Sequence, residues 1–93
     1  MNASISSEIL GRYAADAARE APGVRALARR RSVKVTNDGE AVRVEVHVAV
    51  EWGAAIPELA GGIQVRVREY LLRMADIEPA EVDVVVDEIG PRA

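Results

Sequence analysis

The sequence predicts an α+β fold, a two-layer sandwich in the order α-β-β-α-β, with a three-stranded sheet and two helices on one of its faces. Two segments, residues 7–21 and 56–74, place apolar residues at helical spacing. Valine alternates with other residues from position 42 to position 50, which is typical of a strand with one buried face. Apolar residues make up 49% of the 93-residue chain, enough for a packed core.

The first predicted helix runs from about Ser7 to Ala21. Ser6 is suited to cap its N-terminus, and Glu8 lies in the first turn, where the helix dipole favours an acid. Pro22-Gly23 ends the helix, because proline lacks a backbone donor and glycine permits a left-handed exit. The apolar stripe of this helix consists of Ile9, Leu10, Tyr13, Ala14, Ala17, Ala18 and Ala21.

Two predicted strands form a hairpin. The first lies within the extended stretch 24–36, most clearly at residues 32–36. Asn37-Asp38-Gly39 is typical of a turn, because these residues tolerate positive φ. The second strand spans residues 42–50 and turns its non-valine positions towards water. Those positions are Arg43, Glu45, His47 and Ala49.

The second predicted helix runs from about Ile56 to Met74 and serves as the crossover to the last strand, Val82 to Ile89. Gly61-Gly62 inside this helix is unfavourable by roughly 1 kcal/mol per glycine relative to alanine. That cost suggests a close approach of the helix to the sheet or to the first helix, or a kink. We expect one domain over residues 1–93, with its core at about 5–89.

Composition excludes several classes of function. The chain has no cysteine, which rules out thiolate nucleophiles, disulfides and cysteine-based metal sites. Its net charge of −3 does not favour binding to nucleic acid. Neither a signal-peptide pattern nor an apolar run of about 20 residues is present. We therefore expect a cytoplasmic domain without direct membrane insertion and without a cofactor.

Charge is segregated along the chain. A basic stretch without acids contains Arg25, Arg29, Arg30, Arg31 and Lys34, and an acidic stretch without bases contains Asp76, Glu78, Glu81, Asp83, Asp87 and Glu88. The basic stretch is either a solvated strand entry or a contact for an anionic partner or for the acidic stretch. The last of these contacts can form within one chain, or between copies, where it would build open head-to-tail chains.

Two residues that occur once each, His47 and Trp52, are candidates for chemistry or binding. His47 is expected to be an ordinary exposed strand residue, with a metal site that includes Glu45 or Asp83 as a weak alternative. Trp52 either seals the edge of the core or is an exposed anchor for a partner. No catalytic constellation was found. The candidate interaction residues are Arg29, Arg30, Arg31, Lys34, Trp52, Asp83, Asp87 and Glu88.

The order of short motifs carries a family resemblance. Ile5-Ser6 opens a helix, Pro22-Gly23-Val24 follows it, and the valine alternation leads to Trp52-Gly53. Ile56-Pro57, Ile63-Gln64-Val65 and the closing Val82-Asp83-Val84-Val85-Val86 with Ile89 continue the pattern. In this order and spacing, residues 5–89 resemble the alkaline shock protein family of Gram-positive and related bacteria. The chain departs from that family in having no glycine shortly after Met74.

The resemblance implies a non-enzymatic scaffold or protein-interaction domain of cell-envelope homeostasis or stress response. It also implies a protein partner, which in some relatives is a small membrane-anchored protein with a related domain, or a homo-oligomer. The alternative is a KH-like nucleic-acid-binding module, which the element order and the basic residues 29–31 with Lys34 suggest. That module needs a G-x-x-G loop, and the sequence contains none.

Overall fold

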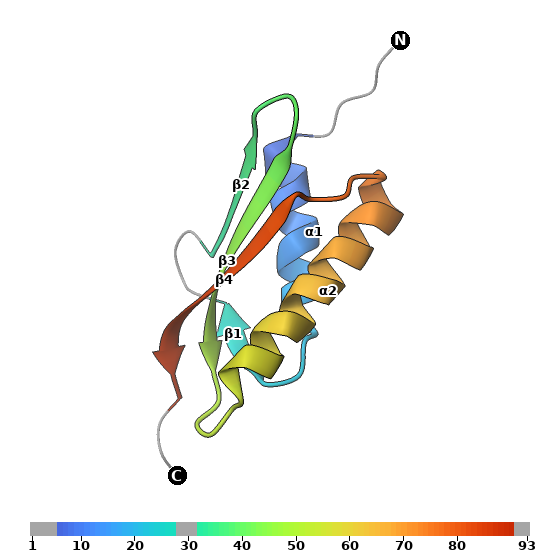
Figure 1. Ribbon diagram of the computed structural model, residues 1–93. Helices are drawn as coiled ribbons and strands as arrows, with labels where there is room; N and C mark the ends of the chain where they lie inside the picture. Colours follow the sequence, from blue (N-terminus) through green and yellow to red (C-terminus); the bar gives the residue numbers. More distant parts are fainter. Residues whose placement is uncertain (1–5, 28–31, 91–93) are drawn as a thin grey trace.

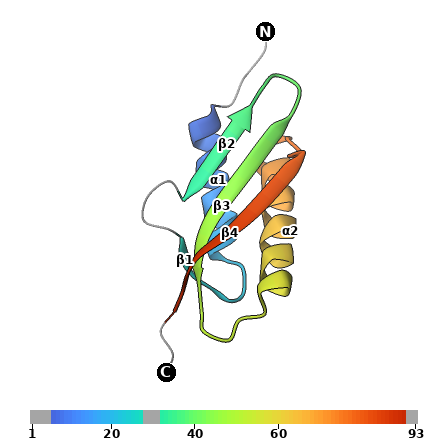
Figure 2. The same ribbon diagram turned by 60° about the vertical axis from the view of Figure 1, so that its left-hand side comes forward.

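The computed structural model of the chain describes residues 6–27 and 32–90. In this part of the chain, two helices cover one face of a four-stranded sheet (Figures 1 and 2). The predicted α+β sandwich is confirmed. The elements are α1 (Ser7–Arg19), β1 (Val24–Leu27), β2 (Val33–Asn37), β3 (Val42–Val50), α2 (Ile56–Ala75) and β4 (Glu81–Ile89).

β3 lies at the centre of the sheet. β1 and β2 both pair with it antiparallel along one side, β1 with residues 48–50 and β2 with residues 42–46. β4 pairs with it parallel along the other side, in a register that sets Val44 opposite Val82. The hairpin of β2 and β3 and the crossover through α2 are therefore formed as predicted.

The predicted count of three strands is wrong, because the first predicted strand is divided into β1 and β2. Leu27 is paired with Val48, and Val33 is paired with Val46. Six positions separate Leu27 from Val33, whereas two separate their partners on β3. The chain thus carries four more residues here than the register can pair, and one continuous strand is impossible.

Local hydrogen bonds explain where the helices and the hairpin begin and end. The Ser6 hydroxyl accepts a hydrogen bond from the Ile9 N–H at 3.2 Å, which confirms the predicted cap of α1. In the hairpin turn, Asp38 Oδ1 accepts hydrogen bonds from the N–H groups of Glu40 and Ala41 at 3.0 and 2.9 Å. Gly39 follows Asp38 with a φ of 91°, a conformation that glycine adopts without strain.

The core lies between the sheet and the two helices. The five valines of β3 at alternate positions point into it, and none is more than 8% exposed. Burial of one such side chain contributes about 1.5–3 kcal/mol. Alanines on α1 let that helix lie close to α2 and the sheet. The helix residues that bury these valines are Leu10, Ala14, Ala17 and Ala18 from α1, and Leu59, Ile63, Val67 and Leu71 from α2.

The two glycines in α2 are not explained by a close approach to another element. A Cβ atom built on Gly61 or on Gly62 meets no atom within 4 Å. The predicted close approach is therefore wrong. Gly23 is the opposite case, since its φ is 87° and a Cβ there would lie 2.8 Å from Leu59 Cδ1.

We expect Gly61→Ala to raise the free energy of unfolding by about 1 kcal/mol, because alanine loses less backbone freedom in a helix and the added methyl group has room. Urea denaturation followed by circular dichroism measures the change. Gly23→Ala is the control and should destabilise the protein. A loss of stability in Gly61→Ala would contradict the open surroundings of this position.

Candidate interaction surface

The sheet face opposite the helices, called the open face below, carries rows of polar side chains. The register places Lys34 of β2, Glu45 of β3 and Asp83 of β4 in one row. Thr36, Arg43 and Glu81 form the next row. Side chains of one row are neighbours across the strands, so opposite charges in a row attract. The open face is thus built from the polar positions that alternate with the core valines.

Arginine side chains bridge the acids at both ends of the sheet. Arg43 lies 3.2 Å from Asp38 Oδ2 through Nη1 and 3.8 Å from Glu81 Oε2 through Nε. Arg25 Nη1 lies 3.8 Å from Glu88 Oε1. The side chains in these pairs are 46–66% exposed, so each pair contributes little to stability.

His47 is held between two carboxylates. Its Nε2 lies 2.8 Å from Glu45 Oε2, and its Nδ1 lies 3.0 and 3.1 Å from the two carboxylate oxygens of Asp87. The His47 side chain is 24% exposed. The prediction of an ordinary exposed strand residue is therefore wrong. Glu45, one of the two predicted metal partners, contacts His47, but no group of three His, Cys, Asp or Glu residues in the described chain is arranged to hold a metal ion.

A β-bulge lies next to the contact between Asp87 and His47. Val48 pairs with Val86, but Ala49 pairs with Glu88, so Asp87 is an extra residue on β4. The register sets Val85 opposite His47, and Asp87, two residues further along β4, reaches the imidazole diagonally. This contact spans 40 positions in the chain and depends on the register between β3 and β4, which no local pattern specifies.

These contacts favour the charged form of His47. The hydrogen bond to Glu45 raises the pKa of His47 above its ordinary value of 6.5, and Asp87 adds to this effect. Partial burial of the ring lowers the pKa of His47; this effect is smaller than that of the hydrogen bond to Glu45 but larger than that of the hydrogen bond to Asp87.

The basic and acidic stretches meet at the contact between Arg25 and Glu88, which reaches across β3 with 3.8 Å between Nη1 and Oε1. Arg29, Arg30 and Arg31 lie outside the described residues. Lys34 is exposed on β2, whereas Asp83, Asp87 and Glu88 are exposed on β4, and β3 separates the two strands. Of the described basic residues, Arg25 therefore makes the contact with the acidic stretch, and Lys34 lies one strand away from it.

An exposed apolar surface lies where β3 and β4 end. Trp52 is 57% exposed and Ile89 is 51% exposed. With Ile56, they line an open groove of about 260 Å³, and the register pairs Ile89 with Val50, two residues before Trp52. We call Trp52, Ile56 and Ile89 the sheet-end surface. Trp52, which the sequence offers either as a seal of the core edge or as an exposed anchor, thus has more than half of its surface exposed.

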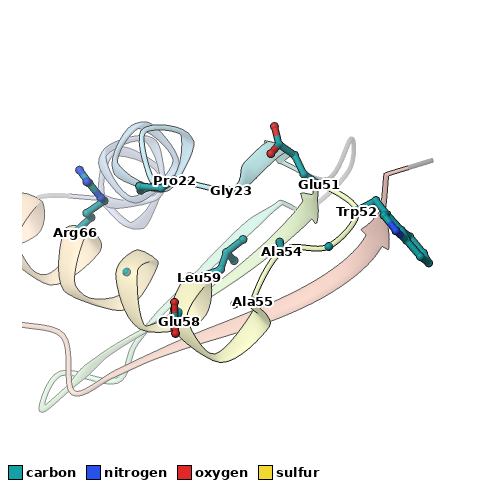
Figure 3. A pocket seen from close by; sticks show the side chains of 11 residues that line it. Pro22, Gly23, Glu51, Trp52, Ala54, Ala55, Glu58, Leu59 and Arg66 are labelled. Carbon is teal, nitrogen blue, oxygen red and sulfur yellow. The ribbon is translucent and has the colours of Figure 1, made fainter. Parts of the chain in front are cut away.

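A second and larger groove, of about 550 Å³, adjoins the sheet-end surface (Figure 3). It lies between the end of α1, the loop after β3 and the first turns of α2, with Leu59 among its lining residues. Figure 3 shows the Trp52 ring pointing away from Leu59 and from α2. Trp52 therefore stands at the boundary of both grooves.

We expect the stability of the protein to fall as the pH rises through the raised pKa of His47. A group whose pKa is higher in the folded state than in the unfolded state stabilises the fold fully below its unfolded pKa, near 6.5, and loses that contribution above its folded pKa. Urea denaturation between about pH 5.5 and 8.5 measures this loss. His47→Gln should remove it; an unchanged pH dependence in that variant would assign the effect to other groups.

Comparison with known proteins agrees with this fold. Variants of the MamM CTD are similar in structure: a manganese form has a TM-score of 0.66 and 17% sequence identity, covering 89% of this chain and 99% of that one. A nickel form has a TM-score of 0.65 and 18% identity, covering 87% and 96%. At such low identity, the likeness concerns the fold alone. No curated protein matches the chain in sequence.

A match to a family model shows which protein family the chain belongs to. Within residues 6–27 and 32–90, neither helix has the length and apolar character needed to cross a membrane. The family model that matches residues 1–91 describes a cell envelope-related function. The chain belongs to the alkaline shock protein family.

Proposed function

We propose that this chain is a non-enzymatic protein-interaction domain with a cell envelope-related role, and that it binds its partner through the sheet-end surface. The observation that carries the proposal is the exposure of Trp52 and Ile89 at the adjoining ends of two paired strands. Tryptophan is enriched among the residues that dominate binding energy at protein interfaces. An apolar partner side chain that enters this groove removes both residues from water.

Trp52 is presented by a short, hydrogen-bonded loop. The Glu51 N–H donates to the Gly23 carbonyl at 3.3 Å, and the Ala54 N–H donates to the Glu51 carbonyl at 3.1 Å. Gly53 supplies the positive φ of 84° that this turn requires. A loop held in this way loses little conformational freedom on binding, which favours affinity.

The surroundings of the sheet-end surface point to the charge of the partner. Asp87 and Glu88 are exposed beside Ile89, and Glu51 is exposed beside Trp52. Basic residues around an apolar anchor would complement this acidic rim. In this proposal the partner is a membrane-anchored protein with a domain of related type, which would bring this chain, as one cytoplasmic domain of residues 1–93, to the membrane. The alternative partner is a second copy of the chain. Lys34 stands in a row with two acids, which does not favour nucleic acid.

The test is a quantitative pull-down with the wild-type chain, Trp52→Ala and Val65→Ala as baits. Val65 is 54% exposed on α2, away from the sheet-end surface, and is the matched control for loss of an exposed apolar side chain. We expect Trp52→Ala to lose a partner that both other baits retain, because only this variant removes the anchor. Circular dichroism checks that all three are folded.

Sedimentation of the three purified proteins over a range of concentrations separates self-association from binding to another protein. A second copy as the partner predicts concentration-dependent association that Trp52→Ala weakens and Val65→Ala does not. Identical partners and identical association for all three proteins would contradict the proposed surface.

A further inference from the structure

The contacts of His47 are satisfied best in one protonation state. An ionised carboxylate only accepts hydrogen bonds, and both Glu45 and Asp87 lie within 3.1 Å of a ring nitrogen. Both contacts are hydrogen bonds to ionised carboxylates when both nitrogens donate, which only the imidazolium can do. In the neutral ring, one nitrogen carries a lone pair that would face a carboxylate oxygen at hydrogen-bonding distance.

The charged groups around His47 favour that imidazolium. Glu45 comes from its own strand, and Asp87 comes from β4. Asp83 and Lys34 stand opposite Glu45 on the two neighbouring strands, so one cation and one further acid lie in the next row. Just before β2, the Ser32 carbonyl accepts a hydrogen bond from the backbone N–H of His47, at 2.7 Å. The two described side chains that hydrogen-bond to the ring are thus both carboxylates.

The contact of Asp87 with His47 lies beside an interruption in the pairing of β3 and β4. Asp87 is the extra residue of the bulge and has no partner in the β3 register. Beyond it, the end of β4 is held by the exposed Arg25–Glu88 pair at 3.8 Å and by the Gly90 N–H, which donates to the Val50 carbonyl at 2.6 Å. The imidazolium therefore links the two strands across the interruption in their ladder.

We propose that Glu45, His47 and Asp87 form a pH-sensitive clasp that holds the end of β4, and with it the Ile89 part of the sheet-end surface, against β3. The consequence for binding rests on the function proposed above for that surface. When His47 loses a proton to solvent, only one ring nitrogen still carries a hydrogen. Nε2, which makes the shorter contact of 2.8 Å to Glu45, keeps that hydrogen, and Nδ1 then presents a lone pair to Asp87. Asp87 is repelled, and the end of β4 separates from β3 more often.

The clasp has a built-in reporter in Trp52, the only tryptophan of the chain. Trp52 lies two residues beyond Val50, and the groove that it lines is also lined by Ile89. Movement of the end of β4 therefore changes the surroundings of the indole ring. Acrylamide quenching of its fluorescence measures that change without any partner.

The experiment compares the wild-type chain with His47→Gln and with Glu69→Gln, which removes an exposed acid from α2, on the side of the sheet opposite His47. Amide hydrogen exchange of residues 88–90, corrected for the intrinsic base-catalysed rate, is followed together with Trp52 quenching from about pH 5.5 to 8.5. For the wild type and Glu69→Gln, we expect protection of residues 88–90 to fall as the pH rises through the raised pKa of His47. Protection of the central residues of β3 should stay constant.

His47→Gln should show no pH-dependent step in either measurement, because glutamine does not titrate in this range. The clasp is overturned if the wild-type end of β4 keeps constant protection, or if His47→Gln shows the same step. Neither readout needs a partner. If the pH-dependent step is observed but Trp52→Ala retains all partners, the result supports the clasp and refutes only the proposed binding surface.

Discussion

β3 holds the structure together, because it pairs with all three other strands while its valines fill the core. A shift of its register by one residue would turn five buried valines to water and four other residues to the helices. At about 1.5–3 kcal/mol for each buried side chain, such a shift costs an amount comparable to the whole net stability of a small domain. The period-two pattern of this strand therefore determines which side chains reach the open face.

The same strand builds the features on which function is proposed to depend. Arg43, Glu45 and His47 occur on β3 because they alternate with the core valines, and they meet the acids of β4 across the parallel ladder. The bulge at Asp87 changes that simple pairing. It shifts the register by one residue, so that Glu88 and Ile89 pair with Ala49 and Val50. Beside this irregularity, Glu45, His47 and Asp87 form a close cluster of titratable side chains on the described open face.

Large apolar residues are exposed at the sheet-end surface but buried in the core. The core valines and leucines are buried almost completely, whereas Trp52 and Ile89 remain more than half exposed. A hydrogen-bonded loop holds Trp52 outward instead of letting it fold over the core. Scattered exposed residues on α2, such as Val65 and Leu72, are common on protein surfaces, but an exposed tryptophan beside a groove is typical of binding sites.

Sequence alone determined the features that depend on neighbouring residues. The bounds of β3, the Ser6 cap, the glycine after α1 and the Asn37-Asp38-Gly39 turn follow from propensities and periods read over a few positions. Tertiary structure decided the rest: the division of β1 from β2, the open surroundings of Gly61, the exposure of Trp52 and the pairing of His47 with Asp87. Each of these depends on the register between strands or on packing between elements far apart in the chain, and no local pattern specifies either.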